Sequence, residues 1–502
     1  MRFSKTLIPT TRETPKNISD PAVARLARAG YIIPDQDRRT VSLLPMGVLL
    51  WERVISGVAD LAREAGFQIV GFEDLAGDAL AVSQKLVKSY RQLPLSFLGG
   101  DIRRVDAAGF AADLDSAFTA RDAFLEIARE IAGMAGLAAY SGETTGGARK
   151  YVSLPCEKGS WHAASGFICS SCQWCGDEAS PSPSPEPYRE EEAPLQEVET
   201  PGADTIVELC RQLDIAPART LKTMFYAAET PGNKEIVVVL ARGDHQINDR
   251  KLSHVLGSAV VRFADPLEIR EAVGDLAGYL GPVGLSSGIR VFADLHVEGC
   301  RNLVVGANKP DFHLLNACWG RDFKAGRVVD IVSLQEDILC PDCGSAVLPA
   351  HLARISVAGV EPEVSGLTFQ GDGGAPRAAF RWDGNLCLNI LIFAMTRAEG
   401  FPARFAPFDV NVVIASMKND DAVALGHTLL ERLEARGLRV LLDDREERAG
   451  VKFSDAELLG IPVTVIAGRE ASEGIVETWL PDGSRSELPA DAVIEHAIRL
   501  IQ

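Results

Sequence analysis

The stretch Arg242-Gly-Asp-His-Gln-Ile-Asn-Asp-Arg-Lys251 decides how the middle of this 502-residue chain is interpreted. It is a polar island that directly follows the apolar run 235–240. Two more islands, Leu221-Lys222-Thr223 and Gly306-Ala307-Asn308 with His313 beyond it, flank apolar segments such as 301–305 in the same way. Short apolar runs bounded by polar clusters are typical of strands. Residues 200–335 therefore predict a compact domain whose strand ends build a polar pocket.

Composition and charge place the rest of the chain among ordinary globular proteins. Its length predicts about three or four domains, and 46% apolar with 24% charged residues is unexceptional. We find neither an apolar run long enough to span a bilayer nor a signal-peptide core, so we expect a cytoplasmic protein that does not contact membranes. A net charge of −18 argues against DNA binding. The basic segment 1–30 is either solvated surface or a local contact for nucleic acid.

The ten cysteines are too sparse for a disulfide scaffold, but five of them are grouped. They form Cys169-x-x-Cys172-x-x-Cys175 and Cys340-x-x-Cys343. Paired CxxC motifs favour a structural zinc ion, with Cys169, Cys172, Cys340 and Cys343 as ligands and Cys175 as a possible substitute. The alternative is a set of reduced thiols packed as small apolar groups.

Periodicity predicts the secondary structure of the flanking regions. Apolar residues at helical spacing indicate helices near 48–65 and 116–134 in a mixed α/β first part. Alternating prolines make 180–188 a linker, because proline blocks helix and ladder hydrogen bonds. From residue 405 strands alternate with a helix, which predicts a small, mainly parallel sheet. Its predicted strands are 409–414, 438–442 and 461–466, and its predicted helix is 421–436.

Several ordered motifs make the chain resemble the bacterial-type prolyl-tRNA synthetases, which are class II aminoacyl-tRNA synthetases. The longest runs without a gap from Asp443-Asp-Arg-Glu-Glu-Arg448 to Gly460-Ile-Pro462. The others are Arg28-Ala-Gly30, Leu44-Pro-Met-Gly47, Lys88-Ser-Tyr-Arg-Gln-Leu-Pro94, Ser141-Gly142 with Gly146-Gly147, and Leu280-Gly-Pro-Val283. The resemblance covers nearly the whole chain.

The resemblance implies a multidomain α/β and α+β fold. A class II antiparallel sheet core would occupy 1–180 and 336–404, interrupted by a Pro/Glu-rich linker at 181–199 and an inserted mixed α/β editing domain at 200–335. An α/β anticodon-binding domain would occupy 405–502. The family also implies tRNA of the proline isoacceptors as partner and a homodimer formed through the core.

The editing domains of this family hydrolyse alanine that has been mischarged onto proline tRNA, and they use a lysine, an aspartate and a histidine. These roles carry over to Lys222, Asp294 and His313. The pocket would be supported by Gly281, Gly306, Ala307, Asn308, Asp244 and Asn248. Taken singly, the three main residues could equally be a surface lysine, a loop aspartate and a core histidine. In the C-terminal domain the resemblance implies tRNA contacts from Asp444, Arg445, Arg448, Lys452 and Asp455, and the alternative is a solvated helix cap.

The proline-activating elements of the family depart from the pattern at three places. The Thr-Glu pair expected before Lys88 is missing, and only Arg103 and Arg104 remain of an arginine-rich region after Pro94. The region 382–391 has apolar residues near the position where an arginine is expected. We predict a tRNA-binding editing hydrolase that has lost adenylation, so ATP and Mg²⁺ are needed only if the ligase site is active. The alternatives are a functional proline–tRNA ligase with a diverged site and a non-catalytic tRNA-binding or regulatory protein.

Overall fold

The computed structural model describes residues 1–15, 18–35, 37–101, 103–144, 149–183, 190–230, 233–257, 260–273, 280–285, 288–334, 339–361, 366–396 and 400–501. The chain divides into two compact units, each considered by itself below. Unit 1 contains Met1–Ser141, Arg149–Ser165 and Ala350–Gln502, and unit 2 contains Gly142–Ala148 and Gly166–Pro349. The predicted linker motif lies partly outside the described residues, and the predicted domain boundaries stay a prediction.

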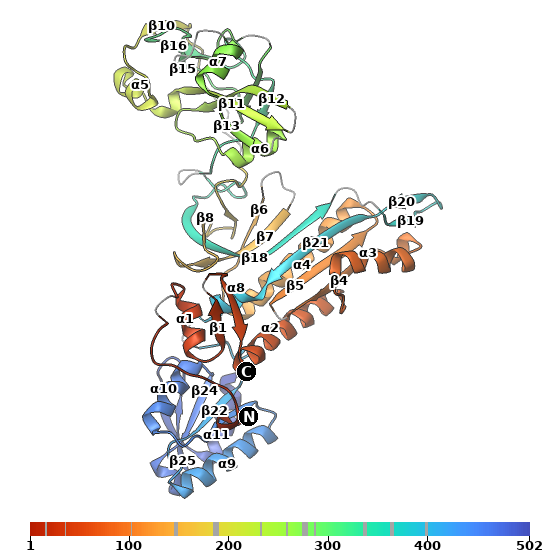
Figure 1. Cartoon of the computed structure of the whole chain (residues 1–502), viewed down its shortest axis with the longest axis vertical. Coiled ribbons are helices and arrows are strands. Elements are labelled where there is room, and N and C mark those ends of the chain that lie inside the picture. The colour runs from red at the N-terminus through yellow and green to blue at the C-terminus, as the bar shows by residue number, and fades with distance from the viewer. Residues whose placement is uncertain are drawn as a thin grey trace. The chain divides into compact units, whose positions relative to one another are not determined.

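A large, mainly antiparallel sheet forms the centre of unit 1 (Figure 1). Its strands are ordered β3-β4-β5-β21-β18-β7, and of the registered pairs only β3–β4 is parallel. The antiparallel sheet core predicted for this region is therefore confirmed. The bounds are β3 (Gln68–Ile69), β4 (Leu95–Gly100), β5 (Arg104–Ala111), β21 (Phe380–Cys387), β18 (Leu348–Glu361) and β7 (Arg149–Cys156).

Helices bury their apolar faces on both sides of this sheet. On one side Phe124 of α4 packs against Trp382 of β21, with ring centroids 6.0 Å apart. On the other side Leu75 and Ala79 of α3 join Phe110 of β5 in a separate apolar cluster. The predicted helices near 48–65 and 116–134 are α2 and α4. Bounds are α1 (Pro21–Arg28), β1 (Ile32–Asp35), β2 (Thr40–Leu43), α2 (Pro45–Glu64), α3 (Leu75–Leu86), α4 (Leu114–Met134), β19 (Thr368–Gln370), β20 (Pro376–Ala378) and α8 (Leu388–Met395).

The C-terminal part of unit 1 is a second sheet, ordered β23-β22-β24-β25-β26. The strands β22 (Val410–Ile414), β23 (Val440–Asp443) and β24 (Val463–Ala467) pair in parallel, close to the predicted positions. The strands β25 (Ile475–Trp479) and β26 (Arg485–Pro489) add an antiparallel hairpin, so the sheet is mixed rather than mainly parallel. Most residues of β26 are exposed and polar, which hid it from an apolar pattern. The helices are α9 (Asp420–Ala435), α10 (Ala449–Leu459) and α11 (Ala490–Ile501).

Unit 2 contains a mixed five-stranded sheet and a smaller antiparallel one. The larger is ordered β13-β11-β12-β14-β17, and the smaller β10-β16-β15. Buried Phe225, Leu240, Ala293 and Val305 belong to the core between their strands. Bounds are β10 (Gln196–Glu199), α5 (Ile206–Leu213), β11 (Leu221–Thr230), β12 (Asn233–Arg242), α6 (Asp249–Leu256), β13 (Val260–Phe263), α7 (Pro266–Val273), β14 (Arg290–Asp294), β15 (Leu303–Gly306), β16 (Phe312–Ala317) and β17 (Arg327–Val329).

No helix in the part of the chain that the structure describes is long and apolar enough to cross a bilayer.

Candidate functional site

Lys222 lies at the start of β11 and reaches the loop that follows β12. Its Nζ donates a hydrogen bond to the carbonyl oxygen of His245 at 2.7 Å. Burial lowers the pKa of the half-buried ammonium, while the carboxylate of Asp244 acts in the opposite direction. The charge of Lys222 is therefore held at one fixed position, partly shielded from solvent.

Asp294 ends β14 and is completely buried. Its Oδ1 accepts hydrogen bonds from His296 N at 3.0 Å and lies 2.7 Å from His296 Nδ1, and its Oδ2 accepts one from Ile331 N at 3.1 Å. Burial alone raises the pKa of Asp294, but the hydrogen bonds from His296 and Ile331 outweigh it and hold the pKa below its usual range. Asp294 is thus an ionised carboxylate that His296 and Ile331 hold in a fixed position.

The rings of His245 and His296 meet edge to face, with centroids 4.9 Å apart. Burial lowers the pKa of His245 to about 4, against the opposing effect of Asp244, so this ring is neutral near pH 7. Arg242 Nη2, which can only donate, lies 3.2 Å from His245 Nε2, and Arg242 also pairs with Asp244. His245 Nε2 therefore accepts, and the proton lies on Nδ1.

A metal ion is a second explanation for this cluster, because one donor atom from each of His245, Asp294 and His296 lies within 4.8 Å of the others. Two contacts oppose it. A metal on His245 Nδ1 would move the proton to Nε2, which faces the donor Arg242 Nη2. Asp294 already accepts from His296 and Ile331. The hydrogen bonds account for the arrangement without an ion.

A second group of predicted residues gathers around β15 and β16. Gly306 and His313 are paired positions in their register, and Gly281 N donates to Asn308 Oδ1 at 2.8 Å. A Cβ at Gly281 would lie 1.7 Å from the carbonyl oxygen of Gly306, so glycine is required there. Asn308 has φ +57°, the left-handed region. Ala307 N donates to Phe312 O at 3.3 Å, which closes the turn.

His313 belongs to this second group and not to the cluster around Asp294. Its Nδ1 lies 2.7 Å from Thr200 Oγ1, and burial lowers its pKa. The bridge between Thr220 and Val304 connects the two sheets near Lys222. Within the part of the chain that the structure describes, no side-chain hydrogen bond or ion pair joins His313 to Lys222 or Asp294. The sequence-predicted trio is therefore divided between two neighbouring groups.

Asn248 and Asp244 shape the loop before α6. Asn248 is the N-cap of α6, where its Oδ1 accepts from Arg250 N and Lys251 N, both at 3.1 Å. Asp244 pairs with Arg242 and so fixes the turn that carries His245. Both residues support the site rather than enter it.

His296 was not predicted as a site residue, although it lies only two residues after the predicted Asp294 in the sequence.

The four cysteines of the two CxxC motifs come together in unit 2. Their Sγ atoms lie within 4.8 Å of one another, and the Cys169–Cys343 and Cys172–Cys340 pairs are each 3.5 Å apart. Tetrahedral zinc with Zn–S bonds near 2.3 Å requires Sγ atoms about 3.8 Å apart. The donor set thus fits a structural zinc ion. Cys175 is buried and lies outside this group.

The five predicted tRNA contacts in the C-terminal part differ in their exposure. Lys452 is fully buried and donates to the carbonyl of Ile414 at 2.7 Å, so RNA cannot reach it. Asp455 is also buried and pairs with Arg445 at 2.9 Å. Arg445 in turn stacks on Phe3, and Asp444 accepts from Ser4 N. Arg448, the N-cap of α10, is exposed to solvent.

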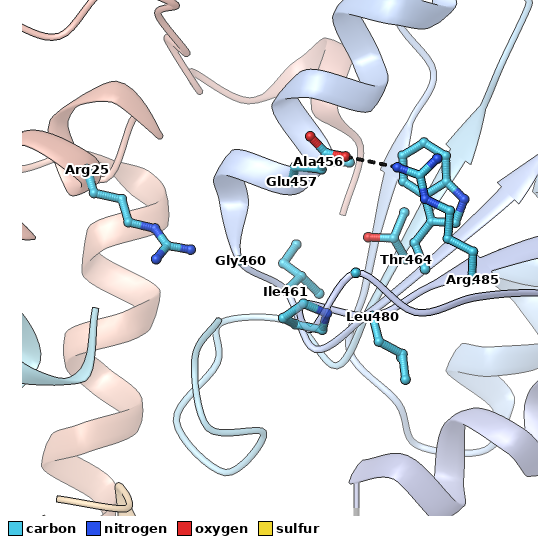
Figure 2. A pocket seen from close by; sticks show the side chains of 11 residues that line it. Arg25, Ala456, Glu457, Gly460, Ile461, Thr464, Leu480 and Arg485 are labelled. Atoms are coloured by element: carbon cyan, nitrogen blue, oxygen red, sulfur yellow. Dashed lines mark hydrogen bonds and ion pairs between the residues drawn. The ribbon is translucent and has the colours of Figure 1, made fainter. Parts of the chain in front are cut away.

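A cavity of about 280 Å³ lies between α1 and the C-terminal sheet. Figure 2 shows Arg25 on one side of it and the Glu457–Arg485 ion pair on the other. Arg485 also lies over the ring of Trp479, with its Cζ 3.9 Å from the ring centroid. A neighbouring cavity of about 460 Å³ is lined by Arg12, Arg25 and Arg28 among others. Cationic and aromatic groups of this kind suit unpaired RNA bases and phosphates.

Comparison with known proteins gives these sites a context. Residues 200–323 match the family described as aminoacyl-tRNA editing domain, and residues 409–496 match the anticodon binding domain. Curated proline–tRNA ligases are similar over part of the chain. The ligase of Levilactobacillus brevis is 36% identical over 296 residues, 57% of this chain and 51% of the relative. The ligase of Aquifex aeolicus is 33% identical over 320 residues, which are 62% of this chain and 56% of the relative.

The ligase of Pelobacter propionicus is 32% identical over 349 residues, which are 66% of this chain and 60% of the relative. The chain thus spans a little over half the length of the curated relatives it matches. Together the sheets, the editing segment and the anticodon-binding segment define an aminoacyl-tRNA synthetase-like protein. More narrowly, the matched part of the chain is similar to the bacterial-type prolyl-tRNA synthetases.

Proposed function

We propose that this chain binds proline tRNA and hydrolyses alanine mischarged onto it, using residues 200–335 as the editing domain. One observation carries the proposal: Lys222 and Asp294 meet through His245 and His296 inside the segment that matches the editing family. A fixed ammonium suits the anionic 3′ end of tRNA, since lysine acts as a point charge toward phosphate. The neighbouring imidazoles and carboxylate suit ester hydrolysis, which needs only a positioned, activated water.

The second sheet supplies the other wall of the proposed site. Gly281 approaches the backbone of Gly306 so closely that no side chain fits between them, and this contact holds the loop at 281–283 against β15. His313 on β16 then orients the ester and determines which amino acid fits. A functional proline–tRNA ligase is the alternative, and it is favoured by the retained antiparallel sheet. A non-catalytic tRNA-binding protein, the other alternative, would need neither the editing site nor a proline-activating site.

Replacing Lys222 with alanine should lower the rate of Ala-tRNA(Pro) deacylation by about 10²-fold, because one preorganised cationic donor is lost from the site. The measurement is release of labelled alanine under single-turnover conditions. Lys234→Ala is a matched control, since Lys234 lies at the opposite end of the same β11–β12 hairpin and pairs with Glu268. Equal rates for wild type and Lys222→Ala would contradict this assignment. Absence of hydrolysis by the wild type would favour the binding-protein alternative.

The proposed tRNA contact in the C-terminal part rests on exposed cations. Replacing Arg448 with alanine should weaken tRNA binding and reduce the dependence of log K on log salt by about 0.7 to 0.9, the change for one phosphate contact. The comparison is Arg436→Ala, which removes an exposed arginine of the same domain that pairs with Glu495. Binding is measured by filter retention between 50 and 200 mM salt, a range in which phosphate contacts weaken by orders of magnitude. An unchanged salt slope would exclude Arg448 from the interface.

The cysteine cluster is proposed to hold a structural zinc ion. It lies where residues 166–176 and 339–349 of unit 2 come together. In the proposed organisation these segments flank the editing domain, so the four thiolates would tie together the two chain crossings. Bound zinc supplies fixed tetrahedral coordination and no step of the hydrolysis. The homodimer and the cytoplasmic location stay predictions.

A further inference from the structure

The Asp294–His296 pair is a buried acid–imidazole contact to which no individual chemical role has yet been assigned. Asp294 is held at three points, by His296 N, His296 Nδ1 and Ile331 N. A carboxylate can only accept hydrogen bonds, so the contact at 2.7 Å places the imidazole proton on Nδ1. His296 Nε2 then carries a lone pair. The ring keeps 10% of its surface exposed, which leaves an approach to it.

A second polar atom of the same cluster, Nδ1 of His245, supports a role in binding. His245 is only 6% exposed, and its Nδ1 has no hydrogen-bond partner among the described residues. Because Nε2 accepts from Arg242, this orphan Nδ1 carries a proton and is a donor. A buried donor without an acceptor is unfavourable unless water or a ligand satisfies it. Its ring meets that of His296 edge to face.

We infer that His296 Nε2 is the general base of the hydrolysis, that Asp294 is its positioning residue, and that the proton on His245 Nδ1 binds the water or the ester oxygen. The inference rests on the proposed deacylase function and deepens it. Water oxygen attacks the ester carbonyl carbon as His296 Nε2 takes a proton from that water. The bond from carbon to the ribose oxygen then breaks, and that oxygen takes the proton from His296. The products are free alanine and tRNA with its terminal hydroxyl restored.

The contacts of the two histidines distinguish His296 from His313 for this role. His313 meets a hydroxyl, Thr200 Oγ1, through Nδ1 and has no carboxylate among its described partners. A hydroxyl neither fixes the tautomer nor stabilises the imidazolium as a carboxylate does. Lys222 also lies beside this pair of histidines, because its Nζ donates a hydrogen bond to the backbone carbonyl oxygen of His245. The positive charge and the base therefore belong to the same cluster.

Chemical rescue tests the inference. Single-turnover deacylation of Ala-tRNA(Pro) is measured for wild type, His296→Ala and His313→Ala, each with and without added imidazole. His296→Ala should lose about 10²- to 10⁴-fold in rate, the usual contribution of a general base. Imidazole should restore part of that rate in His296→Ala and none in His313→Ala. His254→Ala, which removes an exposed histidine of α6, should match the wild type.

The outcomes separate the role of His296 from the proposed function itself. A wild-type rate in His296→Ala, or a loss that imidazole does not restore, overturns the inference while wild-type hydrolysis still supports the deacylase function. Absence of hydrolysis by the wild type overturns both. Asp294→Asn adds a readout for the positioning role: kcat should fall while KM stays nearly constant, because the asparagine amide no longer stabilises the imidazolium. A change confined to KM would contradict positioning.

Discussion

Replacing Cys343 with serine should release zinc from the purified protein and lower the melting temperature of unit 2 by on the order of 10 °C. The expectation follows from the four Sγ atoms gathered within 4.8 Å. Cys343 is exposed, so its thiol contributes little by packing. An exposed Cys→Ser change without a metal should alter stability by less than about 0.5 kcal/mol. Zinc content is measured by mass spectrometry, and stability by calorimetry with and without chelator.

Cys175→Ala provides the contrast for this experiment. Cys175 belongs to the same sequence motif but lies outside the four-sulfur group, and it is buried. We expect this variant to lose some packing energy and to keep its zinc. Zinc retained in Cys343→Ser, or lost in Cys175→Ala, would show that the ligand set differs from the one assigned. Equal melting curves with and without chelator would leave reduced, packed thiols as the explanation.

Helices and strands were predictable where regularly spaced apolar residues of the sequence are also the residues packed in the core. Helix α4 and strand β22 bury regular apolar positions, so their patterns fix both type and place. The β25–β26 hairpin was missed because polar residues such as Glu477 and Ser486 alternate with few apolar ones. Helix α10 shows a different limit. Its Lys452 and Asp455 are buried by hydrogen bonds and an ion pair, and no sequence pattern reveals that charged residues point inward.

The candidate site was predictable only through its motifs. Lys222, Asp294 and His313 were found because they stand in matched segments, but their grouping depends on two sheets that meet in space. His296 resembles a loop histidine in the sequence. Its ring is brought back to Asp294 by the turn in which Asp294 Oδ1 accepts from His296 N. That turn is local, but the burial that makes the pair stand out comes from the packing of β14 against its neighbours, which the sequence pattern does not show.

We expect no proline-dependent ATP–pyrophosphate exchange above background from this protein. In the region where the family places a phosphate-binding arginine, helix α8 follows β21, and its Leu388 and Leu391 are completely buried. Of the two arginines that remain after Pro94, Arg103 and Arg104, the second is bound to Asp106 at 2.6 Å. Each lost preorganised contact to the transition state lowers the rate by about 10²- to 10³-fold. Losing several together should place adenylation below detection.

A bacterial proline–tRNA ligase, assayed at the same proline and ATP concentrations, is the positive control for the exchange assay. Exchange within about tenfold of that enzyme would show that other residues support adenylation, since tenfold is only about 1.4 kcal/mol of barrier. A cooperative calorimetric unfolding transition of unit 1, measured on the same preparation, shows that a negative exchange result does not come from unfolded protein. The residues proposed for editing, the Lys222–His296 cluster, lie in unit 2, whereas β21 and α8, where the family pattern for adenylation is expected, lie in unit 1. Loss of adenylation with retained hydrolysis is therefore physically consistent in one chain, because the hydrogen bonds described for Lys222 and Asp294 go to His245, His296 and Ile331, all in unit 2.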